Sequence, residues 1–164
     1  MNTISATYPS PIGYICIEHH DAKLRRVQIL GAELAACGQP DSFTDGVYSQ
    51  ILEYLAGERQ HFDVEIDISP CTEFQQRVFR ALQNIPYGTT HTYKEVAATI
   101  GQPTAARAVG MANNRNPIHI IIPCHRVVGS NGSMVGFAAG VAVKEKLLKL
   151  EQDLLLMTDS VGRG

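Results

Sequence analysis

The chain has 164 residues, of which 45% are hydrophobic, enough for one ordinary domain or two small domains with real cores. No apolar run approaches the roughly 20 residues that a membrane span needs. The N-terminus lacks the basic start and apolar stretch of a secretory signal. These features argue against a membrane protein, and we expect a cytoplasmic one.

The four cysteines, Cys16, Cys37, Cys71 and Cys124, are scattered without a CxxC pair, which predicts reduced thiols and no metal site. The net charge of −2 is unevenly distributed. Residues 1–69 carry four Lys/Arg and ten Asp/Glu, a balance of −6, whereas residues 70–164 carry ten and six, a balance of +4. Small domains also differ in charge by chance, but any surface that faces nucleic acid is expected in the C-terminal half.

Three short runs in the first part of the chain alternate apolar and polar residues, at residues 12–18, 24–30 and 62–66. This alternation predicts half-buried antiparallel strands. Between the second and third runs, residues 48–56 place apolar side chains on one helical face, and Gly57 is suited to end that helix. The first part of the chain is therefore predicted to be a small sheet with one helix.

Helical periodicity replaces this alternation after residue 69, and we place the domain boundary there, between residues 1–69 and 70–164. Thr72 and Gln75 fit a capping box at the start of a helix with an apolar stripe. The Pro-Tyr-Gly sequence at residues 86–88 is expected to turn the chain. The second domain is thus predicted to be mostly helical.

A second capping box, Thr92 with Glu95, predicts a helix that Gly101 ends. A three-residue turn follows, and a further helix is expected from about Thr104 to Met111. Two helices joined in this way have the layout of a helix-turn-helix. Many helical hairpins without a DNA role share this layout. The side chains of the second helix must therefore distinguish a DNA-binding unit from an ordinary helical hairpin.

That second helix contains mainly small residues and one long cation, Arg107. It lacks the several hydrogen-bonding side chains with which a major-groove reader contacts base edges. Close docking in the minor groove fits better, with Arg107 filling the space left by a base rotated out of the stack. The alternative is a helix face that packs inside the domain. The small residues are Ala105, Ala106, Ala108 and Gly110.

An apolar, β-branched run at residues 118–122 predicts a buried strand. It leads directly into Pro123, Cys124, His125 and Arg126. A thiol beside an imidazole and a guanidinium has the features that lower a thiol pKa and raise the thiolate fraction. A bare Cys-His pair would more often be a buried thiol with an incidental histidine, so the wider context matters.

In that context, residues 122–127 (Ile-Pro-Cys-His-Arg-Val) resemble the active-site signature of the methylated-DNA–protein-cysteine methyltransferases, also called O6-alkylguanine-DNA alkyltransferases. The resemblance covers nearly all of residues 70–151 in the family's order and spacing, whereas residues 1–69 match only in general character. The further matching segments are residues 74–88, 92–100, 105–110, 116–117 and 140–151.

The resemblance implies an α+β fold with two parts. A small N-terminal α/β domain has an antiparallel, ribonuclease H-like sheet, and a mostly helical C-terminal domain contains a winged helix-turn-helix. The implied function is DNA repair by direct reversal of damage, without a cofactor. The implied partner is double-stranded DNA containing O6-alkylguanine, bound through the minor groove by a monomer that flips the base. The nucleoid, or the nucleus in a eukaryote, is the implied place of action.

The resemblance also implies roles for individual residues. Cys124 accepts the alkyl group, His125 takes the thiol proton through a water, and Glu151 orients and polarises His125. Asn116 braces the turn that carries the cysteine, and Tyr93 contacts guanine N3 so that the base leaves in neutral form. The implied DNA-binding residues are Arg107, Ala105, Ala106, Ala108, Gly110 and Arg126, and the implied substrate pocket comprises Val127, Phe137, Ala138 and Ala139.

The bond under attack explains this residue set, because a carbon on guanine O6 is an unactivated alkyl centre that requires a soft, strong nucleophile. Displacement by thiolate leaves a thioether that Cys, His and Glu cannot hydrolyse. We therefore expect the protein to be consumed once per lesion. The substrates implied by the resemblance are methyl and larger alkyl groups on guanine O6, with O4-alkylthymine as a further candidate.

Two departures from the family pattern stand out. Residues 137–140 read Phe-Ala-Ala-Gly where the family usually has Tyr-Ser/Ala-Gly-Gly. Ala139 is expected to stiffen this loop or narrow the pocket, and so to alter the range of alkyl groups accepted. Phe79 stands where the family commonly has tryptophan, a large-for-large core change expected to matter little.

Three other functions compete with alkyl transfer. A non-enzymatic alkyl-lesion binder would keep the DNA helix, but Cys124 argues against it. A transcriptional regulator would need base-reading side chains, which the second helix nearly lacks. A cysteine hydrolase would need an oxyanion hole and would leave the DNA-binding features unexplained.

Overall fold

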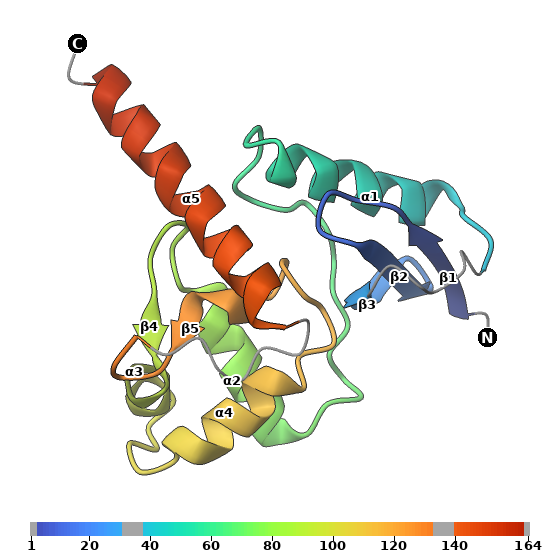
Figure 1. Cartoon of the computed structure of the whole chain (residues 1–164). Helices are drawn as coiled ribbons and strands as arrows, with labels where there is room; N and C mark the ends of the chain where they lie inside the picture. Colours follow the sequence, from blue (N-terminus) through green and yellow to red (C-terminus); the bar gives the residue numbers. More distant parts are fainter. Residues whose placement is uncertain (1–2, 31–37, 133–139, 163–164) are drawn as a thin grey trace. The chain divides into compact units, whose positions relative to one another are not determined.

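The structure of the chain is a computed structural model that describes residues 3–30, 38–132 and 140–162 (Figure 1). The chain forms two compact units, which are described separately. The first comprises residues 1–72 together with 117–121, and the second comprises residues 73–116 together with 122–164.

The first unit contains an antiparallel sheet in the order β1-β2-β3 and one long helix, α1 (Figure 1). Alternate residues of β2 are buried, with Ile15 and Ile17 fully inside, because one face of the sheet packs against the core. The strands predicted at residues 12–18 and 24–30 are thus confirmed. The elements are β1 (Thr3–Tyr8), β2 (Tyr14–His20), β3 (Lys23–Leu30) and α1 (Ser42–Leu55).

Helix α1 begins six residues earlier than the apolar pattern predicts, at Ser42. Its start is fixed by a capping box in which the Asp41 carboxylate accepts from the Thr44 amide and the Thr44 hydroxyl contacts the Asp41 amide. At the other end, Gly57 has a φ of +81°, the left-handed conformation that glycine adopts without strain. The predicted role of Gly57 in ending the helix is confirmed.

The strand predicted at residues 62–66 does not form. Ile66 makes a single bridge with Leu24, and the rest of this run is in no strand. Phe62, Val64 and Ile66 are half-buried while Asp63 and Glu65 are exposed, so the predicted alternation of faces is present, but a single bridge does not make a strand. Alternation alone therefore misidentified this segment as a strand.

Residues 117–121 belong to the first unit although the sequence places them in the C-terminal domain. The Val27 amide donates to the Pro117 carbonyl (2.9 Å), and the His119 amide donates to the Val27 carbonyl (2.8 Å). The Ile118 side chain is buried as predicted, but the run is not a strand, because Ile120 has a φ of +73° that breaks the extended backbone. This conformation is strained for a β-branched residue.

The second unit is mainly helical, and a short parallel pair, β4-β5, is the sheet found among its described residues (Figure 1). Its core includes Val78, Phe79 and Leu82 from the apolar stripe of α2. None of the helices in the described ranges is long and apolar enough to cross a membrane. The elements are α2 (Glu73–Gln83), β4 (His91–Thr92), α3 (Tyr93–Thr99), α4 (Ala106–Asn114), η1 (Cys124–Arg126), β5 (Val127–Val128) and α5 (Val141–Gly162).

Helices α3 and α4 form the helix-turn-helix. Thr92 and Glu95 make the predicted capping box, and Gly101, with a φ of +77°, follows the end of α3. Helix α4 starts two residues later than predicted and continues three residues beyond Met111 to Asn114. It extends because the Asn113 side chain is buried and bonded, which outweighs the low helix propensity of asparagine.

Candidate active site

The thiol of Cys124 lies at the start of the short helix η1, directly after Pro123. The cysteine is only 1% exposed, so its sulfur is enclosed by protein on all sides. The Cys124 amide donates to the Ile122 carbonyl (2.8 Å), which makes a tight turn before η1. Helix α5 packs against η1 and supplies two buried ionisable side chains, Lys144 and Glu151.

Two buried asparagines hold the segment that carries the thiol. The Asn116 amide nitrogen donates to the Ile122 carbonyl (2.8 Å), and its side chain also hydrogen-bonds the Cys124 thiol. The Asn113 amide nitrogen donates to the Cys124 carbonyl (3.3 Å). The backbone on both sides of the cysteine is therefore tied to the end of α4. Asn113 was not identified from the sequence, where it reads as an ordinary turn residue.

The expectation of a lowered thiol pKa is wrong for the protein without substrate. Burial raises the pKa of Cys124 to about 11 and outweighs the opposing effects of Asn116, the Lys144 ammonium and nearby backbone amides. The imidazole of His125 and the guanidinium of Arg126 are not directed at the thiol, because both groups face Glu151. The resting nucleophile is a protonated thiol.

The carboxylate of Glu151 is fully buried and accepts hydrogen bonds at both oxygens from Gly88, His125 and Arg126. One oxygen accepts from the Gly88 amide (2.9 Å) and from Nε of Arg126 (2.9 Å). The other accepts from Nε2 of His125 (2.7 Å) and from Nη2 of Arg126 (3.0 Å). Burial alone would raise the pKa of Glu151, but His125 and Arg126 outweigh it and lower this pKa to about 2.

Because Glu151 is ionised, it can only accept, so Nε2 of His125 carries a proton and Nδ1 is the unprotonated nitrogen of the neutral ring. Burial lowers the pKa of His125, an effect that Glu151 opposes. A neutral imidazole beside Cys124 is the form that can accept a thiol proton. The structure thus brings Cys124, His125 and Glu151 together as the resemblance implies.

The assignment of Arg126 to DNA binding is wrong. Its side chain is buried, and its guanidinium is held by Glu151 and by the Ile85 carbonyl (2.8 Å). The guanidinium also lies 5.5 Å from the centre of the Tyr87 ring. The resemblance implied contact with DNA, but the charge of this guanidinium is used inside the fold.

Lys144 is a buried cation that the sequence did not single out. Its ammonium donates to the Val127 carbonyl (2.5 Å) and interacts electrostatically with Cys124. Burial lowers the pKa of Lys144, and the nearby Cys124 opposes this effect. Helical spacing could have revealed it, since Lys144 shares one face of α5 with the buried Leu148 and Glu151.

Tyr93 lies at the first position of α3 and is half-buried. Burial and the nearby Cys124 raise its pKa, and a side-chain hydrogen bond with Asn113 lowers it. The Tyr93 ring also faces Gly110 of α4, where an added Cβ would lie 3.9 Å from it. The tyrosine, itself part of the helix-turn-helix, therefore lies close to the thiol and to α4.

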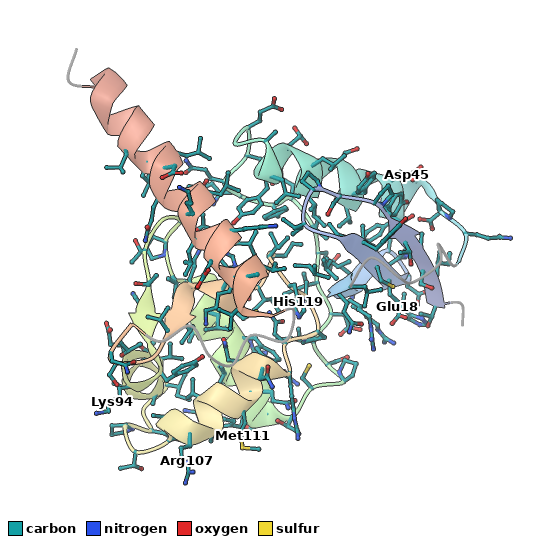
Figure 2. All side chains as sticks on the ribbon, viewed as in Figure 1. Glu18, Asp45, Lys94, Arg107, Met111 and His119 are labelled. Carbon is teal, nitrogen blue, oxygen red and sulfur yellow. The ribbon has the colours of Figure 1, made fainter. Side chains whose placement is uncertain are left out.

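Helix α4 presents an open face beside this centre. Arg107, Ala108 and Met111 are exposed on it, and Figure 2 shows the Arg107 and Met111 side chains extending from the same side of the helix. Ala105, Ala106 and Gly110 are half-buried. Of the four residues assigned to the substrate pocket, Val127 is fully buried in β5, and Phe137, Ala138 and Ala139 lie outside the described residues.

The described ranges contain no group of three or more His, Cys, Asp or Glu side chains placed to hold a metal ion. The chemistry that these residues supply is nucleophilic and acid-base. A helix-turn-helix unit that carries a buried thiol with a histidine and a carboxylate defines a thiol-dependent enzyme on a scaffold of the DNA-binding type.

Sequence comparisons narrow this class. Residues 73–153 match the DNA binding domain of 6-O-methylguanine DNA methyltransferase, and residues 4–68 match its ribonuclease-like domain. The chain belongs to the 6-O-methylguanine DNA methyltransferase family.

Similar proteins match this chain in sequence over almost its whole length. The methylated-DNA–protein-cysteine methyltransferase of Methanosarcina acetivorans is 46% identical over 152 residues, which cover 89% of this chain and 96% of that protein. The structure of Mycobacterium tuberculosis O6-methylguanine methyltransferase is 43% identical and covers 93% of this chain and 94% of its own, with a TM-score of 0.83. A structure of Mycobacterium tuberculosis OGT in complex with DNA is 45% identical, covers 90% and 92%, and has a TM-score of 0.82.

Proposed function

We propose that this protein repairs DNA by transferring a methyl or larger alkyl group from O6 of guanine to its own Cys124. Family membership supports the reaction. The observation that carries the assignment to this chain is the buried Cys124, whose neighbour His125 is hydrogen-bonded to an ionised Glu151 on a helix-turn-helix unit. O4-alkylthymine, whose alkyl carbon is also bonded to a base oxygen, is a further candidate substrate.

The proton of the Cys124 thiol moves first. With Nε2 of His125 donating to Glu151, Nδ1 accepts the thiol proton through an intervening water, giving a thiolate and an imidazolium. The Lys144 ammonium stabilises the thiolate as it forms. Because the resting thiol has a raised pKa, this proton transfer must take place before the sulfur can attack.

The thiolate then displaces the base. The sulfur forms a bond to the alkyl carbon while the carbon–O6 bond breaks and its electron pair stays on guanine. Tyr93 donates a proton at guanine N3 and recovers one from the imidazolium, so overall the thiol proton passes to the departing base. The thioether has no route back to a thiol, and each molecule acts once.

A base inside a duplex must be flipped out to reach the thiol. The open face of α4 is the surface that flips it. The small side chains of this face allow a close approach to the minor groove, and the exposed Arg107 fills the gap in the stack. A relative that is 45% identical has been solved in complex with DNA. The active form is a monomer in the cytoplasm, at the chromosome.

Mass spectrometry of the intact protein and its peptides tests this function. After incubation with a duplex containing O6-methylguanine, we expect a single methyl gain on the Cys124 peptide. Undamaged duplex and the Cys124→Ser variant should show none. Tight binding of the damaged duplex without any mass gain would instead indicate a protein that only binds the lesion.

A further inference from the structure

The Arg126 side chain is placed where it can control the proton on His125. Its Nε and Nη2 donate to the two separate oxygens of Glu151, at 2.9 and 3.0 Å, so the guanidinium grips the carboxylate as a fork. Its remaining contacts, the Ile85 carbonyl and the Tyr87 ring, hold the fork in a single orientation. A buried arginine in this geometry is fixed in place and always charged.

Within the part of the chain that the structure describes, five ionisable groups lie around the imidazole or its carboxylate partner. Glu151 and Lys144 face His125 from α5, Cys124 and Arg126 flank it in η1, and Tyr87 lies beside the Glu151–Arg126 pair. Glu151 is the one anion among these groups in the resting site. Without Arg126, the whole charge of this carboxylate would act on the imidazole.

A carboxylate whose charge is not shared with a second cation stabilises the protonated form of a neighbouring histidine. An imidazolium cannot accept the thiol proton, so a permanently protonated His125 would stop the reaction before it began. Arg126 and Lys144 both act in the opposite direction and lower the pKa of His125. Arg126 differs from Lys144 because it binds the carboxylate itself.

We propose that Arg126 is a positioning residue for alkyl transfer: it shares the carboxylate of Glu151 with His125, and so keeps the imidazole neutral until the thiol proton arrives. Glu151 remains ionised and oriented, but part of its charge is balanced by the guanidinium. This proposal rests on the transfer reaction proposed above. It gives the arginine of the Pro-Cys-His-Arg sequence a role inside the active site.

The test measures single-turnover alkyl transfer from free O6-benzylguanine as a function of pH, in the wild type, Arg126→Gln and Arg126→Lys. The free base needs no flipping, so DNA binding does not enter the rate. In Arg126→Gln the acid limb of the profile should move up by about one pH unit, which makes the rate on that limb about tenfold lower, with recovery at higher pH.

Arg126→Lys retains the charge but one ammonium cannot grip both oxygens. Its acid limb should stay near that of the wild type while its plateau falls. Arg80→Gln is the matched control, because Arg80 is exposed in the same unit and bonds only to the Gln76 side chain among the contacts found. Its profile should match the wild type throughout.

A uniform loss of rate in Arg126→Gln with an unmoved limb would overturn the proposal and leave Arg126 a purely structural role. A limb that moves as far in Arg126→Lys as in Arg126→Gln would overturn it as well. An NMR titration of the His125 ring nitrogens gives a readout independent of transfer, and the His125 pKa should rise in Arg126→Gln. If the wild type transfers nothing, the proposed function fails, while this titration still decides the effect of Arg126.

Discussion

The Lys144 ammonium is the cation that acts on the Cys124 sulfur from α5, and it is buried with a carbonyl of β5 as its hydrogen-bond acceptor. Burial of both groups makes their interaction stronger than it would be at the surface. Lys144 therefore offsets part of the cost of forming a thiolate in a closed site.

Replacing Lys144 with methionine keeps much of the side-chain volume and removes the charge. We expect the Cys124 pKa to rise further and transfer from free O6-benzylguanine at neutral pH to slow by about tenfold, equivalent to about one pKa unit. Single-turnover rates measure this effect. Lys146→Met is the control, since Lys146 is exposed on the same helix. Equal rates in the Lys144→Met variant and the wild type would show that Lys144 does not assist ionisation.

Site residues that belong to a short sequence motif were easier to predict than site residues whose partners lie on other elements. Cys124 and His125 follow from a short sequence motif, and Glu151 from its place in a long resemblance. The direction of the Cys124 pKa was wrong, because a motif shows neighbours in sequence but does not show the extent of burial. Arg126 and Lys144 were misassigned or missed because their partners lie on other elements.

In the proposed function, the exposed face of α4 binds and flips the damaged base, whereas the chemistry takes place at the thiol. Arg107 is exposed there, beside a surface of small side chains. In Arg107→Ala we expect repair of O6-methylguanine in duplex DNA to slow by tenfold or more, on the order of the few kcal/mol that unstacking a base requires. Transfer from free O6-benzylguanine should change little, because no base needs flipping.

The matched control for this comparison is Arg26→Ala, which removes an exposed arginine from β3 in the other unit. Both substrates should then react as in the wild type. A loss in Arg107→Ala that is equal for the duplex and the free base would contradict a role in flipping and indicate a disturbance of the site.

Elements whose ends are set by local chemistry were predicted well. The Thr92–Glu95 capping box and the left-handed Gly101 delimit α3 where the sequence indicates. The end of α4 was misplaced because the buried contact of Asn113 with the Cys124 carbonyl is tertiary. Residues 118–122 were predicted to be a strand from composition, whereas the φ of +73° at Ile120 reflects packing that composition does not encode.

At the scale of the whole molecule, the two units are compact but not consecutive in sequence. Residues 117–121 carry two fully buried isoleucine side chains, Ile118 and Ile120, into the first unit. A fragment of residues 70–164 would expose them. Each buried isoleucine contributes roughly 1.5–3 kcal/mol, a large fraction of the stability of a small domain.

We therefore expect the fragment of residues 70–164 to unfold at a much lower temperature than the full chain, or to aggregate on expression. Circular dichroism during heating of both proteins measures the difference. Changing Ile118 and Ile120 to threonine in the fragment should reduce its aggregation by lowering the exposed apolar area. A fragment that unfolds at the same temperature as the full chain would show that this segment does not need the first unit.

The return of residues 117–121 to the first unit has a consequence for how such a protein can evolve. A gene segment that ends before α2 lacks part of the first unit, because residues 117–121 are encoded just before the reactive cysteine. Recombination that exchanged the N-terminal part for an unrelated domain would leave that piece without its partner sheet. Inheritance should therefore keep the two parts together, and sequence drift in β3 should be constrained by the residues that precede Cys124.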